Sequence, residues 1–149
     1  MSRIPSASVW INGRTVAGDQ ATVSVFDRGF LFGESVYETF RTYEGIPWLF
    51  VEHYERLVRS AERLCIRVPY SMTELWEACL RLAEAYRPQE AYLRIIVTGG
   101  VSDIVLEPPH ERTPNVVVIG KVFQPFPAAW YETGAPVVVA QVRRNPAFA

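Results

Sequence analysis

Residues 26–64 read FDRGFLFGESVYETFRTYEGIPWLFVEHYERLVRSAERL, and the rest of the chain is organised around this stretch. Apolar and polar residues alternate over residues 36–41, which is the period of a β-strand. After a Glu44-Gly45 turn, an apolar run predicts a second strand over residues 46–50. The period then changes to that of an amphipathic helix, with an apolar face made of Tyr54, Leu57, Val58, Ala61, Leu64 and Cys65.

The chain before this stretch predicts a β-hairpin followed by a loop. Segments 8–11 and 14–16 flank Asn12-Gly13, a dipeptide typical of a type I′ hairpin turn. Glycines and polar residues within 27–35 predict a loop that leads into the first central strand.

The chain after the central stretch predicts one more helix and two more strands. Ser71 and Glu74 form a capping box, which indicates a helix over residues 71–86. Apolar runs predict strands over residues 91–100 and 116–120. Because strands outnumber helices and hairpin-like links dominate, we predict an α+β domain with a mainly antiparallel sheet and two helices packed on it.

The composition changes after the last of these strands. Residues 123–134 contain prolines and small residues and are typical of a linker. An apolar run predicts a further strand over residues 136–142, and no later strand follows to pair with it. We therefore predict a small N-terminal domain over residues 1–122, a linker over 123–134, and the first strand of a truncated second domain over 135–149.

Composition limits the class of protein. The chain has 149 residues, is 49% hydrophobic and 21% charged, and carries a net charge of −1, so it does not have the basic footprint of a nucleic-acid-binding protein. No apolar run is long enough for a leader or a membrane span. Cys65 and Cys79 fall in helical patterns, which predicts buried, reduced thiols in a cytoplasmic protein. His53 and His110 match no metal-ligand spacing, and we expect a surface residue and a loop residue.

Several polar residues are candidates for a binding site. Arg56 follows Glu52 by four residues, so it forms either an exposed ion pair or an anion site near the start of the helix. Arg94 lies within an apolar strand, so it either snorkels at an edge or meets a carboxylate in a cleft. Tyr37 and Glu38 alternate along a strand and point to opposite faces. By themselves these residues name no reaction.

Three motifs resemble the N-terminal small domain of the class IV (fold type IV) pyridoxal-phosphate-dependent aminotransferases. They read DRGFLFGESVYETFRTY (residues 27–43), EHYERLVRSAERL (52–64) and AYLRIIVTGGVSDIVLEP (91–108), and RRNP follows near the C-terminus. The family includes branched-chain aminotransferases, D-amino acid aminotransferases and aminodeoxychorismate lyases. The resemblance covers nearly the whole chain. It implies an α+β small domain, a homodimer, and pyridoxal 5′-phosphate held between this domain and a larger C-terminal one.

The resemblance also implies roles for individual residues. Arg56 matches the arginine that binds the cofactor phosphate, and Phe32 and Tyr37 match positions that line the substrate pocket. Tyr92 and Arg94 match the Tyr-Ile-Arg pattern of branched-chain aminotransferases, which shapes the substrate-carboxylate side. An arginine suits this role because its guanidinium can hold a carboxylate bidentately.

Two features depart from the family pattern. Many relatives have Thr-Arg-Gly where this chain has Thr98-Gly99-Gly100, and in D-amino acid aminotransferases that arginine helps to hold the substrate carboxylate. The family's Schiff-base lysine is expected beyond Ala149, because Lys121, the sole lysine, does not match its position. The 149-residue chain is therefore predicted to contain no catalytic residue and to be inactive alone.

The sequence predicts the N-terminal portion of an enzyme that moves the amino group of a branched-chain L-amino acid to 2-oxoglutarate. Its expected partners are amino acid and 2-oxo acid substrates and a second copy of the chain, with no metal, nucleic acid or membrane. Aminodeoxychorismate lyase and D-amino acid aminotransferase are the alternatives within this fold. A non-catalytic domain for dimerisation or ligand binding is the alternative of another class.

Overall fold

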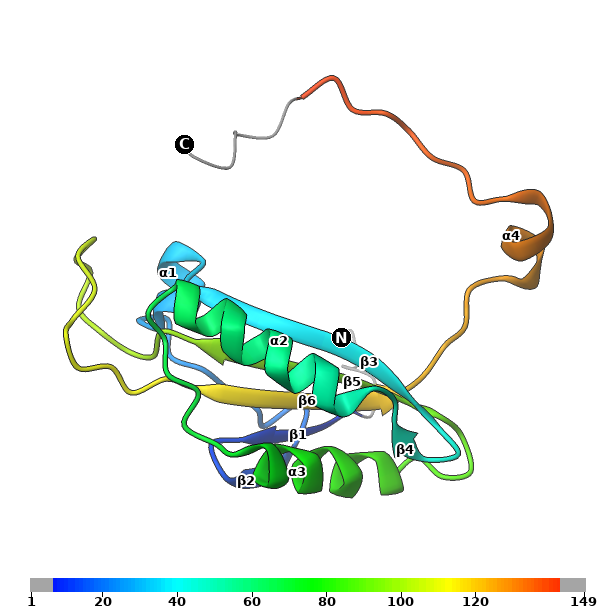
Figure 1. Cartoon of the computed structure of the whole chain (residues 1–149), viewed down its shortest axis with the longest axis horizontal. Coiled ribbons are helices and arrows are strands. Elements are labelled where there is room, and N and C mark those ends of the chain that lie inside the picture. Colours follow the sequence, from blue (N-terminus) through cyan, green and yellow to red (C-terminus); the bar gives the residue numbers. More distant parts are fainter. Residues whose placement is uncertain (1–6, 143–149) are drawn as a thin grey trace.

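A six-stranded antiparallel sheet forms the centre of the computed structural model, which describes residues 7–142 (Figure 1). The strands lie in the order β2-β1-β6-β5-β3-β4, so neighbours in space are often distant in sequence. Their bounds are β1 Ser8–Ile11, β2 Arg14–Ala17, β3 Ser35–Tyr43, β4 Ile46–Pro47, β5 Ala91–Thr98 and β6 Val116–Val122.

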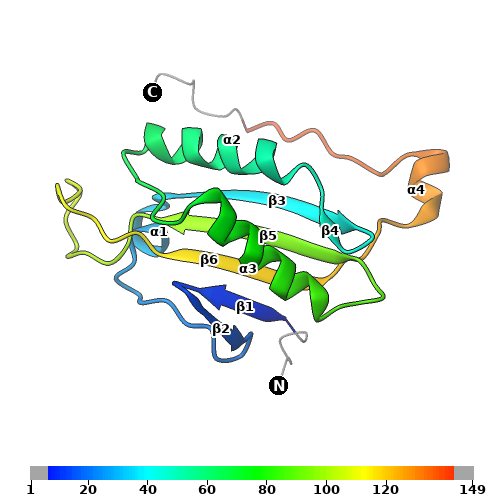
Figure 2. The same ribbon diagram turned by 60° about the horizontal axis from the view of Figure 1, so that its bottom comes forward.

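Two long helices cover one face of the sheet, and within residues 7–142 no helix packs on the other face (Figure 2). Helix α2 packs on β3, and helix α3 packs on β6, β5 and β1. The four helices are α1 Arg28–Phe32, α2 Phe50–Arg63, α3 Met72–Glu84 and α4 Ala128–Thr133. This architecture confirms the predicted α+β class with a mainly antiparallel sheet. None of the helices in residues 7–142 has the length and apolar character that a membrane span requires.

The core lies between the helices and the covered face of the sheet. Strand alternation sends Leu93, Ile95 and Val97 of β5 into this layer, where each is almost completely buried. Leu57 of α2 and Leu75 of α3 meet them from the helix side. Burial of each such side chain stabilises the fold by roughly 1.5–3 kcal/mol, so these residues fix which face of each strand is covered.

Two local predictions are confirmed in detail. Asn12 and Gly13 join β1 to β2 with φ values of +46° and +91°, the left-handed conformations that a type I′ turn needs. Ser71 caps α3: its hydroxyl accepts from the backbone N–H of Glu74, and the Glu74 carboxylate accepts from the backbone N–H of Ser71.

The predicted strand at 46–50 is wrong beyond its second residue. Strand β4 ends at Pro47, and Leu49 adopts a φ of +50° immediately before α2 begins at Phe50. Phe50 is apolar because it packs edge-on against Phe40 in the core, 5.9 Å between ring centroids, and not because it belongs to a strand. The loop expected over 27–35 contains the short helix α1, which Asp27 caps through the backbone N–H of Gly29.

The predicted burial of both cysteines is half right. Cys79 is buried in α3, but Cys65 is exposed. Helix α2 ends at Arg63, and Cys65 has a φ of +53°. Since the helical period no longer applies there, Cys65 does not continue the apolar face.

The predicted strand at 136–142 is not formed in the part of the chain that the structure describes. Residues 124–142 are all exposed, and Val138 is 95% exposed. No strand within residues 7–142 lies beside this segment to supply the hydrogen bonds of a ladder. The predicted linker contains the short helix α4. The division into domains at 122 and 135 stays a prediction.

Candidate functional site

Arg56 is anchored to a buried carboxylate on the neighbouring strand. Its Nε donates to Oε1 of Glu38 at 2.6 Å, and its Nη2 donates to Oε2 at 2.5 Å. His53, one turn earlier on α2, contacts the same Oε2 through Nδ1 at 2.7 Å. An ionised carboxylate only accepts, so His53 Nδ1 carries the proton of this bond. Glu38 thus holds two basic side chains of one helix face.

The environment of Glu38 keeps it charged. Burial raises its pKa, but the hydrogen bonds from Arg56 and His53 and the positive charge of Arg56 together exceed this effect, so the pKa lies below its ordinary value. The same ion pair raises the pKa of Arg56. Glu38 is therefore a permanent anchor for the guanidinium around neutral pH.

Arg56 still has a side that can bind an anion. Its side chain is 60% exposed, whereas that of Glu38 is 7% exposed. Within residues 7–142, Glu38 is its hydrogen-bond acceptor, and no contact occupies Nη1; the protonated Nδ1 of His53 lies 3.2 Å from Nη2, and both groups donate to Glu38. An oriented guanidinium with donors facing outward suits a phosphate group. The donor set at Arg56 therefore fits the phosphate of a cofactor.

Sequence reasoning missed His53 and treated it as an isolated surface residue. The structure places its ring 4.9 Å from that of Phe40, with a side chain that is 16% exposed. The spacing from His53 to Arg56 is i,i+3, which puts both on one helix face. That spacing was a usable signal, but the identity of their shared partner was not readable from it.

Three of the predicted substrate residues come together on the open face of the sheet. The Arg94 guanidinium carbon lies 4.7 Å from the Tyr37 ring centroid and 5.9 Å from that of Tyr92. Arg94 Nε donates to Oγ1 of Thr39 at 3.2 Å, which orients the side chain across β3. Tyr37 is 60% exposed, so this cluster faces outward.

Arg56 does not join this cluster. Tyr37 and Glu38 point to opposite faces of β3, as strand alternation predicts, and Arg56 stays with Glu38 on the face that α2 covers. Strand β3 pairs with β4 only at Thr42 and Tyr43, so the outer edge of its first part is unpaired within residues 7–142. The two groups flank this edge from its two sides.

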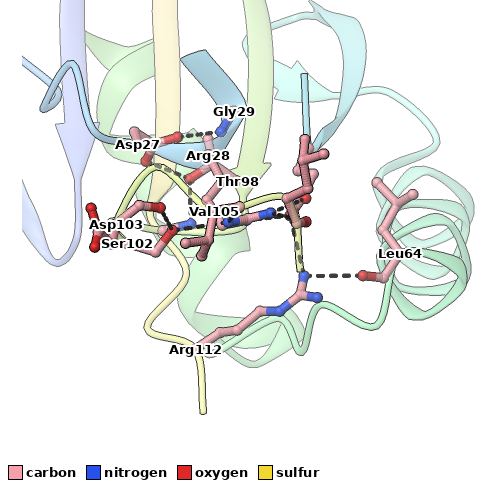
Figure 3. A network of polar contacts seen from close by, with 12 residues as sticks. Asp27, Arg28, Gly29, Leu64, Thr98, Ser102, Asp103, Val105 and Arg112 are labelled. Carbon is pink, nitrogen blue, oxygen red and sulfur yellow. Dashed lines mark hydrogen bonds and ion pairs between the residues drawn. The ribbon is translucent and has the colours of Figure 1, made fainter. Parts of the chain in front are cut away.

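Phe32 lies apart from both groups, at the end of α1, and is half-buried. The Arg28 guanidinium carbon lies 4.6 Å from its ring centroid. Arg28 is completely buried, and its donors reach a carboxylate, a hydroxyl and two carbonyls (Figure 3). Nε and Nη2 donate to Oε2 and Oε1 of Glu34 at 2.8 and 2.6 Å. Nη1 donates to Ser102 Oγ at 3.0 Å and to the Val105 carbonyl at 2.9 Å, and Nη2 also donates to the Leu106 carbonyl at 3.0 Å.

These bonds use all the N–H groups of a guanidinium, so Arg28 is a structural residue. Its hydrogen bonds to Glu34 outweigh burial and lower the pKa of that carboxyl. Asp27 binds both ends of the loop that joins β5 to β6. Its Oδ2 accepts from the hydroxyl of Thr98 at 2.7 Å and from the side-chain amide of Asn115 at 2.6 Å. Together these contacts tie the β5–β6 loop to the start of β3 (Figure 3).

A side chain at Gly99 would crowd the Arg28–Glu34 ion pair. A Cβ at this position would lie 3.1 Å from Oε2 of Glu34 and 3.3 Å from Cβ of Arg28. Arg28 or Glu34 would have to shift by a few tenths of an ångström to accept a side chain there. The glycine at position 99 therefore leaves space for the Arg28–Glu34 ion pair.

A sequence model described as "Amino-transferase class IV" matches residues 35–149. This match covers well over half of the chain, and the motifs and fold agree with it. The chain belongs to the class IV aminotransferase family.

Curated relatives carry several activities. A Methanocaldococcus jannaschii protein named "Putative branched-chain-amino-acid aminotransferase" is 36% identical over 138 residues, 93% of this chain and 47% of that protein. D-alanine aminotransferase of Staphylococcus aureus is 36% identical over 95 residues, 64% of this chain and 34% of that protein. Aminodeoxychorismate lyase of Bacillus subtilis is 38% identical over 97 residues, 64% of this chain and 33% of that protein. The chain thus spans about half the length of these relatives, or less.

Solved structures of class IV aminotransferases have the same fold as this chain. Branched-chain amino acid aminotransferase of Escherichia coli superposes with a TM-score of 0.74 and 28% identity, covering 83% of this chain and 42% of that one. The T.th. branched-chain amino acid aminotransferase complexed with N-(5′-phosphopyridoxyl)-L-glutamate gives a TM-score of 0.71 and 28% identity, covering 81% of this chain and 42% of that one. The described fold is therefore that of fold type IV aminotransferases.

Proposed function

We propose that this chain is the N-terminal part of a pyridoxal-phosphate-dependent aminotransferase that moves the amino group of a branched-chain L-amino acid to 2-oxoglutarate. The family membership and the relatives named for this activity support the proposal. The observation that carries it is the Glu38–Arg56 pair, which orients a guanidinium with outward donors on the covered face of β3, while the Tyr37–Tyr92–Arg94 cluster lies on the open face.

In this proposal Arg56 binds the cofactor phosphate. Glu38 fixes its orientation through two hydrogen bonds, so the phosphate meets donors that are already positioned. When bound, pyridoxal phosphate supplies the electron sink for chemistry at the amino-bearing carbon. A related structure that carries a phosphopyridoxyl group supports this choice of cofactor.

Arg94 holds the substrate carboxylate, and Tyr37 and Tyr92 form the wall beside it. The role of Arg94 rests on its free Nη groups: only Nε is engaged, with Thr39, among the described residues. The resemblance assigns Phe32 to the pocket wall, and in this structure Phe32 lies at the end of α1, where the Arg28 guanidinium packs on its ring. The geometry of these residues favours a substrate with one carboxylate at the reacting end.

The remaining features of the enzyme are predictions from the family. They are the homodimer, the cytoplasmic location, a second domain beyond the linker and a Schiff-base lysine outside this chain. Lys121, the sole lysine of the chain, does not match the position of that lysine in the family motifs. We therefore expect the 149-residue chain alone to form no stoichiometric pyridoxyl-lysine after borohydride reduction, as mapped by mass spectrometry. Stoichiometric labelling of Lys121 together with amino transfer would overturn this expectation.

The test of the phosphate site compares two arginines of α2 in the whole protein. Arg59 pairs with Glu55 in an exposed i,i+4 contact at 3.6 Å, so Arg59→Ala is the matched control for Arg56→Ala. We expect Arg56→Ala to weaken cofactor binding about tenfold or more, since it removes charge-assisted hydrogen bonds, and Arg59→Ala to leave it unchanged. Cofactor absorbance after gel filtration measures retention. Equal retention in the two variants would contradict the assignment.

The substrate assignment has a separate test. Gly99 stands where D-amino acid aminotransferases have a carboxylate-binding arginine, so the whole protein should use L-leucine, L-isoleucine or L-valine in preference to D-alanine. A higher rate with D-alanine would make it a D-amino acid aminotransferase. Pyruvate release from aminodeoxychorismate would make it a lyase, and absence of all three activities would favour a non-catalytic domain.

A further inference from the structure

A cavity of about 510 Å³ lies where the segment between α2 and α3 meets the β5–β6 loop. Its apolar walls include Tyr54 of α2, Val68 and Pro69 of the connecting segment, and Pro114 of the loop. The Tyr54 hydroxyl donates to the backbone carbonyl of Tyr70 at 3.1 Å, which holds this wall in place. A cavity of this volume can hold a small organic ligand.

Arg112 reaches this cavity with donors that the fold does not use. Its Nη1 donates to the Leu64 carbonyl at 3.2 Å and lies 3.5 Å from Oε2 of Glu34 (Figure 3). Within residues 7–142, Nε and Nη2 form no hydrogen bond, although the side chain is only 11% exposed. No fully buried side-chain nitrogen in this part of the chain lacks a partner, so these donors are open to the cavity that Arg112 lines.

The cavity has more positive charge than the neighbouring acids neutralise. Glu34 already accepts two hydrogen bonds from Arg28, so a single carboxylate lies between Arg28 and Arg112. Arg67, which also lines the cavity, is exposed and forms no ion pair within residues 7–142. The cavity therefore joins two available guanidinium groups to an apolar wall.

The acid at the start of α3 does not occupy these guanidinium groups. The Glu74 carboxylate accepts from the backbone N–H and the hydroxyl of Ser71 at 2.8 and 2.7 Å, as part of the capping box. Its charge is therefore held at the terminus of α3, and the donors of Arg112 remain available to a ligand.

We propose that this cavity binds an organic carboxylate with an apolar body, whose negative group is held by Arg67 and Arg112. A guanidinium suits a carboxylate because it offers paired donors in one fixed plane. The valine and proline walls favour a ligand with an aliphatic or aromatic body over a bare phosphate, which would bury no apolar surface there. This site lies on the helix side of the sheet, apart from the Arg94 cluster on the open face, and it does not require amino transfer.

The test uses a local reporter at Cys65 in the whole protein, followed by fluorine NMR. Cys65 is exposed and lines a neighbouring cavity of about 440 Å³, which shares Tyr54, Arg67 and Val68 with the first. A trifluoromethyl group attached to its sulfur therefore senses a ligand beside it, and Cys65→Ser identifies its signal. The probe is 4-methylpentanoate, and 4-methylpentanamide is the neutral counterpart of similar shape.

Three arginine variants test where the carboxylate binds. Arg67→Met removes one cation of the cavity from an exposed side chain that makes no ion pair. Arg63→Met is the matched control, because Arg63 is an exposed arginine at the end of α2 that does not line the cavity. Arg94→Met removes the arginine of the open face, where the same acid could also bind.

We expect 4-methylpentanoate to give a saturable shift of the reporter signal and to bind about tenfold more tightly than the amide, as one charge-assisted hydrogen bond predicts. Arg67→Met should remove this preference by weakening the acid alone. Arg63→Met and Arg94→Met should change the affinity at the reporter by less than about twofold.

Three results would overturn the proposal. They are no saturable shift with the acid, equal binding of the acid and the amide, and an equal effect of Arg63→Met and Arg67→Met. A shift that survives Arg67→Met and is lost in Arg94→Met would assign the binding to the open face, and this result would also reject the cavity as the site.

Discussion

On the covered face of the sheet, Glu38 binds Arg56 and His53 through hydrogen bonds of 2.5–2.7 Å, whereas on the open face Arg94 and Lys121 have no acidic partner within residues 7–142. The covered face is also where the core lies, so an unpaired charge there would be costly. On the open face water solvates the cations until a ligand arrives. On the open face the positive charges are left without a partner, whereas on the covered face Glu38 neutralises and orients Arg56, whose outward donors stay free.

The largest difference between the two faces is expected from a matched pair of aromatic residues on β3. Phe40 is 6% exposed and Tyr37 is 60% exposed. Phe40→Ala should lower the melting temperature by about 15 °C, because it opens a cavity in the core. Tyr37→Ala should lower it by less than about 2 °C. Differential scanning calorimetry measures both, and similar losses would remove the distinction between the faces.

A second comparison concerns arginines with and without buried partners. Arg28→Met leaves the Glu34 carboxylate and two carbonyls without their donor, so we expect a fall in melting temperature of about 10 °C. Arg41→Met, on the open face, should cost less than about 2 °C. Thermal unfolding followed by circular dichroism gives both values. An Arg28→Met protein as stable as the Arg41→Met protein would refute the structural role of Arg28.

The third prediction uses the pH dependence of the covered face. The folded state holds the pKa of Glu38 below its ordinary value, so between the two values the unfolded chain binds more protons and stability rises with pH. The stabilisation is complete above the ordinary carboxyl pKa of about 4.3 and is lost as the pH falls through the folded-state pKa. Glu38→Gln should lower the melting temperature by about 4 °C at pH 7.

Glu38→Gln should also flatten the acid limb of the stability curve. Glu34→Gln is the comparison, because the pKa of Glu34 is lowered by Arg28 in the same direction. Urea titrations over a series of pH values measure the slopes. An unchanged slope in Glu38→Gln would mean that Glu38 is not held in its charged form by Arg56 and His53.

The smallest effect is expected at the two thiols. Burial raises the pKa of Cys79, and its side chain lies in the core under α3, so a thiol reagent should not reach it in the folded protein. Cys65 is exposed and should react with one equivalent of reagent without a change in melting temperature. Reaction of both thiols at equal rates would show that the layer between the helices and the sheet opens readily.

Much of the fold was readable from local sequence. The Asn12-Gly13 turn, the Ser71–Glu74 capping box and the alternation of β5 each rest on residues within a few positions of one another. The candidate residues Tyr37, Tyr92 and Arg94 came from family motifs, and the structure brings these three together. Local pattern and resemblance therefore supplied most of the elements and the candidate residues of the site.

The sequence predictions were wrong where a local pattern is compatible with more than one structure. Phe50 is apolar because it begins α2 and packs on Phe40, although it follows an apolar run that looks like a strand. Cys65 continues the apolar spacing of α2 beyond the point where the helix ends. Residues 136–142 have strand-like composition, but a strand needs a neighbour, and none lies beside them within residues 7–142.

The sequence by itself determined the period of each element, the turn and cap residues, and the family to which the chain belongs. Only the tertiary structure decided that Glu38 is the partner of both Arg56 and His53, that Arg28 is buried among loop carbonyls, and that Lys121 lies beside Tyr92. These contacts join residues from separate elements, and the strand order β2-β1-β6-β5-β3-β4 sets which of them meet. Periodicity says which way a side chain points, but its partner depends on which distant strand or helix packs beside it.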